Sequence, residues 1–161
     1  MGYYVNLASS NVVVKKEHLD AAYKAMIELN DHDGLKRGGS STGKKWFSWM
    51  PEDIAAECPD AQSVLECLGF TTEIRSNGDL WISGYDSKIG QEELFLKAIA
   101  PYVGVVDWHI QENPVNSEPY NPQMEWVGED GEFWMHVFKN NTLYTAAGEK
   151  TYKSEQEVEG F

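Results

Sequence analysis

The chain has 161 residues, of which 42% are hydrophobic, and a formal net charge of −13. This length fits one ordinary globular domain, and six tryptophans, eight tyrosines and six phenylalanines supply apolar surface for its core. The charge is uneven, with +2 in residues 1–50 and −15 in residues 51–161. So acidic a surface disfavours nucleic acid and anionic membranes as partners and favours a basic protein.

The N-terminus lacks the basic region and the long apolar run of a signal peptide. No apolar run approaches the ~20 residues that span a bilayer. We therefore expect a cytoplasmic protein.

Residues 3–14 are rich in β-branched and aromatic side chains and predict an opening strand. Apolar residues at helical spacing then predict a helix that ends near Asn30. Residues 31–45 form a polar, Gly-rich loop that we expect to be mobile. Residues 46–50 predict a short strand closed by Pro51.

A helical stretch is predicted over residues 51–68, with an interruption near Pro59. Asp60 is its candidate N-cap and Gly69 its candidate C-terminal residue. We do not expect its side chains to bring Cys58 and Cys67 together, which argues against a disulfide framework.

Asn77-Gly78 predicts a hairpin between residues 71–75 and 80–84, because both residues tolerate positive φ. An amphipathic helix follows over 91–103. A strand over 105–111 and a Pro-rich loop over 113–122 come next.

The aromatic-rich segment 124–138 predicts a hairpin, followed by a second turn at Asn140-Asn141 and a frayed acidic tail over 155–161. A two-residue turn at Asp130-Gly131 would divide the hairpin into two faces. One face would carry Met124, Trp126, Phe133, Met135 and Val137, and the other Glu125, Val127, Trp134, His136 and Phe138. Together, these elements predict a single α+β domain over residues 1–161, with about three helices packed on one face of a mainly antiparallel sheet.

The candidate binding residues lie in this last hairpin and combine carboxylates with aromatic groups. They are Glu125, Glu129, Asp130, Glu132, Trp134 and His136. An alternative site is the loop 38–45, which resembles a phosphate-binding loop through Gly38, Gly43, Lys44 and Lys45. Lys45, however, stands where magnesium would need Ser or Thr. We predict no catalytic set, no cofactor and no metal site, because the histidines and cysteines are scattered.

Three blocks of sequence carry a resemblance: Lys45-Trp46-Phe47-Ser48-Trp49, the helix over 93–103, and Gly128-Glu129-Asp130-Gly131 followed by Trp134. In this order they resemble the signatures of a family of small acidic proteins from bacteria and their phages. The resemblance covers about half of the chain and implies a shared fold, without an activity to carry over. The Pro-rich segment 113–122 departs from the family, in which we expect a shorter connection.

Three functions follow as hypotheses. The leading one is a non-enzymatic binding or inhibitor module that offers an acidic, aromatic-rich sheet surface to a basic protein. The first alternative is a small hydrolase or nucleotide-binding enzyme that uses the loop 38–45. The second is a DNA-mimic decoy, whose carboxylates would have to repeat at the spacing of phosphates.

Overall fold

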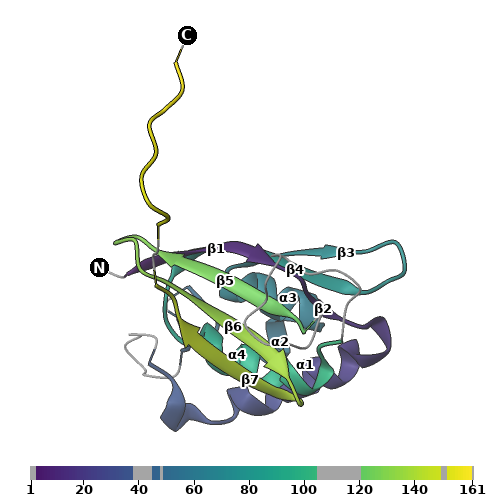
Figure 1. Cartoon of the computed structure of the whole chain (residues 1–161). Coiled ribbons are helices and arrows are strands. Elements are labelled where there is room, and N and C mark those ends of the chain that lie inside the picture. The colour runs from purple at the N-terminus through teal and green to yellow at the C-terminus, as the bar shows by residue number, and fades with distance from the viewer. Residues whose placement is uncertain (1–2, 38–44, 48, 105–120, 150–151, 161) are drawn as a thin grey trace.

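The computed structural model describes residues 3–37, 45–47, 49–104, 121–149 and 152–160. Seven strands form one antiparallel sheet, and the helices lie together on one side of it, as Figure 1 shows. The predicted α+β class is thus confirmed. The elements are β1 (Tyr4–Ser10), β2 (Val12–Val14), η1 (Lys16–His18), α1 (Leu19–Asn30), η2 (Asp33–Leu35), α2 (Ile54–Glu57), α3 (Ala61–Leu68), β3 (Phe70–Ile74), β4 (Leu80–Lys88), α4 (Glu92–Ile99), η3 (Ala100–Tyr102), β5 (Gln123–Gly128), β6 (Phe133–Lys139) and β7 (Thr142–Ala147).

The first strand lies in the middle of the sheet. Strand β1 pairs with the last part of β4 on one edge and with β5 on the other. Strand β2 continues in the same direction along the first part of β4, while β3 takes the opposite edge of β4. Strands β6 and β7 then extend the sheet beyond β5.

The predicted strand over residues 3–14 is divided at Asn11, which is fully buried. The side chain of Asn11 accepts a hydrogen bond from the Gln123 amide N–H at 2.7 Å, and its own amide N–H donates to the Gln123 carbonyl at 3.2 Å. Asn11 therefore links the break in the first strand to the start of β5.

The helical stretch after Pro51 divides as predicted, into α2 and α3. The Asp60 side chain accepts from the Ser63 amide at 2.8 Å, and the Ser63 hydroxyl accepts from the Asp60 amide at 3.1 Å. This reciprocal pair is a capping box. Gly69 ends α3 at a φ of 122°, where a residue with a Cβ would be strained.

The two cysteines are closer than expected. Cys58 follows α2, Cys67 lies in the last turn of α3, and their thiols are hydrogen-bonded to each other. The prediction that these side chains stay apart is wrong, because the break at Pro59 turns α3 back along the chain that precedes it.

Residues 46–50 do not form the predicted strand where the structure describes them. The Met50 amide donates to the Phe47 carbonyl at 3.0 Å and closes a turn instead. The Trp46 indole is buried and donates to the Asn30 side chain at 3.0 Å. Because Trp46, Phe47 and Met50 are all buried, side chains rather than a ladder of hydrogen bonds hold this segment.

Two hairpin loops are one residue longer than predicted. In the β5–β6 loop the Gly128 amide donates to the Glu132 carbonyl at 2.7 Å, which leaves three loop residues, the last of them Gly131 with a φ of 89°. The β3–β4 loop closes in the same way, with Gly78 at a φ of 93°. A third residue shifts the register by one and exchanges the two faces of the strand.

The predicted faces of the last hairpin are therefore wrong. Trp126 pairs with Trp134, and Met124 pairs with His136, so these four side chains share the face toward the helices. Glu125 pairs with Met135 and Val127 with Phe133 on the opposite face. The turn at Asn140-Asn141, by contrast, is confirmed, with positive φ at both residues.

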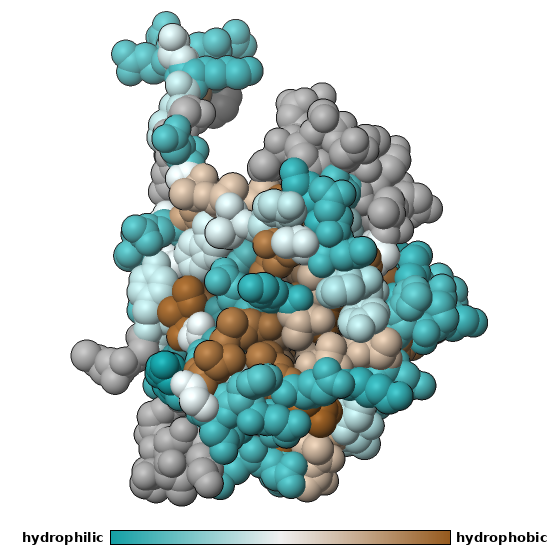
Figure 2. Space-filling model, turned by 90° about the horizontal axis from the view of Figure 1, so that it is seen from below, coloured by the Kyte–Doolittle hydropathy of each residue, from teal (hydrophilic) through white to brown (hydrophobic). Residues whose placement is uncertain are grey.

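The core lies between the sheet and the helices and is rich in rings. Trp126 contacts Tyr85 edge to face, with ring centroids 5.5 Å apart, and Trp46 contacts Phe95 in the same way at 5.1 Å. Figure 2 shows that apolar residues on the face seen from below are bordered by hydrophilic ones. The predicted helix over 91–103 forms α4 and η3. The strand over 105–111 and most of the loop over 113–122 lie outside the described residues.

Candidate functional site

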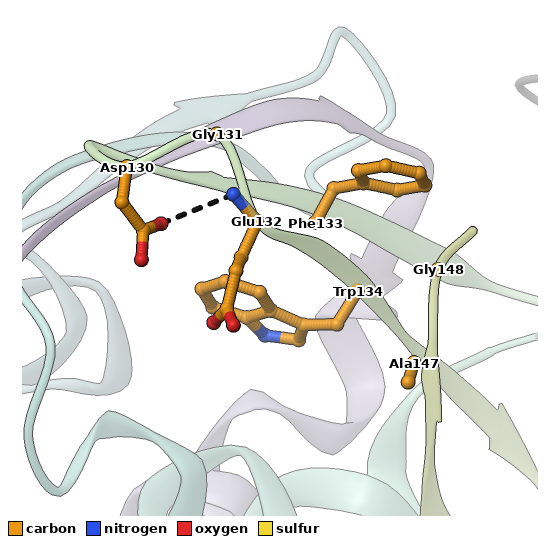
Figure 3. Close-up of a pocket in the computed structure, with 7 residues that line it drawn as sticks. All are labelled: Asp130, Gly131, Glu132, Phe133, Trp134, Ala147 and Gly148. Atoms are coloured by element: carbon orange, nitrogen blue, oxygen red, sulfur yellow. Dashed lines mark hydrogen bonds between the residues drawn. The ribbon is translucent and has the colours of Figure 1, made fainter. Parts of the chain in front are cut away.

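A cavity of about 400 Å³ opens between the start of β6 and the chain that leaves β7. Figure 3 shows the Glu132 carboxylate beside the Trp134 indole, while Phe133 points to the other side of the strand. The cavity thus brings together three of the six predicted binding residues. Its lining consists of Asp130, Gly131, Glu132, Phe133, Trp134, Ala147 and Gly148.

Backbone geometry places these groups. Gly131 takes the positive φ that lets the strand turn, so that Asp130 and Glu132 stand on either side of it. The Gly148 amide donates to the Phe133 carbonyl at 2.9 Å, and a Cβ at Gly148 would overlap the Phe133 ring. Trp134 stacks nearly parallel to Trp126, with centroids 6.3 Å apart, which fixes the indole in the cavity wall.

The Asp130 carboxylate is held in its ionised form. It accepts hydrogen bonds from the Tyr3 hydroxyl and, at 3.0 Å, from the Glu132 amide. The Tyr3 hydrogen bond lowers the pKa of Asp130, and the same bond raises the pKa of Tyr3 to about 12. The cavity therefore keeps a fixed negative charge at neutral pH.

Glu132 differs from its neighbours because its carboxylate is uncommitted. Glu129 accepts from the Tyr4 amide at 3.0 Å, and Asp130 is held by Tyr3. Among the residues that the structure describes, none donates a hydrogen bond to the Glu132 side chain. Glu132 is thus the carboxylate with acceptor positions left for a ligand.

Glu125 lies on the opposite face of the sheet, where its carboxylate accepts from the Ser9 hydroxyl. It lines a second cavity of about 420 Å³, together with apolar side chains that include Val127 and Met135. Phe133 borders both cavities. The predicted binding residues therefore divide between two sides of one hairpin.

His136 is buried and separate from both cavities. The Trp126 indole donates to its Nδ1 at 2.9 Å, and the Glu93 carboxylate lies 2.7 Å from its Nε2. An indole N–H can only donate, so Nδ1 accepts and Nε2 carries the proton that is donated to Glu93. His136 thus joins β6 to α4, and neither of its ring nitrogens is open to a substrate.

Most of the alternative loop site cannot be placed. Gly38, Gly43 and Lys44 lie outside the described residues, and Lys45 alone is described, partly buried and without regular structure. Before this loop, the Lys36 ammonium is buried, 2.7 Å from Asp33 and over the Trp46 ring. The nucleotide-binding hypothesis stays a prediction.

No group of three or more potential metal ligands occurs within the described part of the chain. Within the same part, no helix has both the length and the apolar character needed to cross a membrane. Comparison of the chain with protein-family models, with curated proteins and with solved structures found no match.

Sequence reasoning missed several members of the site. Tyr3 orients Asp130 from the other end of the chain, and Ala147 and Gly148 form the far wall of the cavity. Glu93, the partner of His136, lies on α4. Nothing local distinguishes these residues, because each reaches its partner through the order of the strands and helices.

Proposed function

We propose that the protein is a non-enzymatic binding or inhibitor module that holds a basic protein partner at the open end of the β5–β6 hairpin. The observation that carries the proposal is the cavity in which the Asp130 and Glu132 carboxylates lie beside the Trp134 ring. The cation of a lysine or arginine side chain is attracted to an indole face, and a carboxylate next to the ring adds an ion pair. The lining has the chemistry of a receptor for such a side chain.

The charge of the whole chain supports the same partner. Residues 51–161, which include the cavity, have a net charge of −15. A field of this sign attracts a basic protein over several ångströms and raises the rate of encounter, whereas the cavity would supply the specific contact. The Trp134 ring, fixed by Trp126, has little side-chain freedom to lose on binding.

The proposal extends to setting. On the resemblance of the three sequence blocks, we place the module in the cytoplasm of bacteria or of cells infected by their phages, where it would block or recruit a basic host or phage protein.

The decisive variant is Glu132→Lys, because this side chain faces the cavity and is not otherwise committed. Glu28→Lys is the matched control, since Glu28 is exposed on α1 and the change in net charge is the same. The probe is an arginine-rich peptide, compared with a glutamine peptide of equal length, and the readout is the chemical shift of the Trp134 indole N–H in NMR titrations.

We expect the arginine peptide to shift the Trp134 signal in the wild type and in Glu28→Lys. Glu132→Lys should weaken the binding by ~10-fold or more, because it replaces an attraction with a repulsion in the cavity. Binding in the wild type should weaken as salt is added. Equal losses in the two variants would reduce the effect to net charge, and a Trp134 signal that never moves would refute the proposed cavity.

A further inference from the structure

The Cys58 and Cys67 thiols are in hydrogen-bonding contact, although eight residues separate them along the chain. Side chains from elsewhere hold the backbone on both sides of the pair. The Tyr23 hydroxyl donates to the Cys58 carbonyl at 2.6 Å, and the Trp49 indole donates to the Cys67 carbonyl at 3.1 Å. The contact is thus built into the packing of α1, α2 and α3.

The two thiols differ in their access to solvent. Cys58 is 4% exposed and belongs to the core, whereas Cys67 is partly exposed at its edge. Burial, with the neighbouring Cys67 thiol, raises the pKa of Cys58 to about 11, so Cys58 is protonated at neutral pH. A dissolved oxidant therefore meets Cys67 first.

We propose that Cys58 and Cys67 form an oxidation site, in which Cys67 reacts with a low-molecular-weight disulfide and Cys58 completes an intramolecular disulfide. This site is independent of the proposed binding cavity. In the first step the Cys67 thiolate attacks one sulfur of the small disulfide, and the other sulfur leaves as a thiolate, which takes up a proton. The protein then carries a mixed disulfide at Cys67.

In the second step Cys58 loses its proton to solvent, and its sulfur attacks Sγ of Cys67. The S–S bond to the small molecule breaks, and a second small thiol is released. The two protein thiols together lose two electrons and two protons, which the small disulfide receives as it becomes two thiols. Because Cys58 already contacts Cys67, this step needs only a local adjustment.

The experiment uses the full-length protein and oxidised glutathione as the probe. Intact mass under non-reducing conditions should show the loss of two hydrogen atoms in the wild type. Cleavage after Glu57 and Glu66 places the cysteines on separate peptides, which should stay joined until a reductant is added. Closing this short loop should also raise the Tm by ~5 °C.

Two variants separate the steps. Cys58→Ala should stop at the mixed disulfide on Cys67, whereas Cys67→Ala should not react, because Cys58 is buried. If either variant fails to fold, the joined peptides of the wild type still decide the question. A wild type that stays reduced, or that accumulates the stable mixed disulfide, would overturn the proposal.

Discussion

At the scale of single residues, Glu92 has an unusual environment for a carboxyl group. It is 4% exposed at the start of α4, and its Oε2 accepts from the Gly90 amide at 2.8 Å. Burial raises the pKa of Glu92, despite this hydrogen bond. The folded state therefore binds a proton at Glu92 more tightly than the unfolded chain does.

This shift predicts that Glu92→Gln stabilises the protein at neutral pH by ~1 kcal/mol, because the amide keeps an acceptor for Gly90 without a buried charge. The favourable contribution of protonated Glu92 is complete below the unfolded pKa of ~4.3 and is lost as the pH rises through the folded pKa. The gain from Glu92→Gln should thus be largest at pH 7 and disappear toward pH ~4. Urea denaturation at a series of pH values measures it.

Glu28→Gln is the control, because Glu28 is exposed on α1. We expect its effect to be within ~0.5 kcal/mol at every pH. A destabilised Glu92→Gln variant at pH 7 would mean that the ionised carboxylate makes a stronger bond to Gly90 than burial removes.

At the scale of elements, α3 begins with the capping box of Asp60 and Ser63. Asp60→Ala removes the acceptor for the Ser63 amide and should cost ~1 kcal/mol in the free energy of unfolding. Asp60→Asn keeps an acceptor at the same place and should cost only a few tenths of that amount. Chemical denaturation of both variants tests this, and equal losses would assign the effect to charge instead of the cap.

Prediction from the sequence succeeded where a local rule determines the structure. The Asp60 cap, the Gly69 terminus and the Asn140-Asn141 turn each depend on residues within a few positions of one another. The aromatic and acidic composition of the last hairpin likewise pointed to Asp130, Glu132 and Trp134, which do share a cavity.

Prediction failed where one residue of loop length decides the outcome. Asp-Gly and Asn-Gly suit both a two-residue turn and a three-residue loop that ends in glycine at positive φ. The structure has the three-residue loop in both hairpins, which moves His136 from the predicted outer face into contact with Glu93. The buried turn over residues 46–50 was missed because its apolar residues mimic a strand.

At the scale of the whole molecule, a net charge of −13 means that the folded chain repels itself. Raising the ionic strength from ~0.01 M to ~0.15 M shortens the Debye length from ~30 Å to ~8 Å and should screen this repulsion. We therefore expect the Tm at pH 7 to rise by a few degrees, as measured by calorimetry. The rise should vanish near the sequence pI of about 4.6, and a fall at pH 7 would show that attractive ion pairs dominate.

The central position of β1 constrains the order in which the chain can fold. Tyr4 pairs with Lys88, and Val5 pairs with Gly128, so the first strand has no complete set of neighbours until most of the chain has been synthesised. Contacts of such long range require large loops to close before they stabilise anything, which slows folding. On the ribosome, β1 emerges first and waits longest, as an apolar strand with both edges open, and during that interval the nascent chain is most exposed to aggregation and to chaperones.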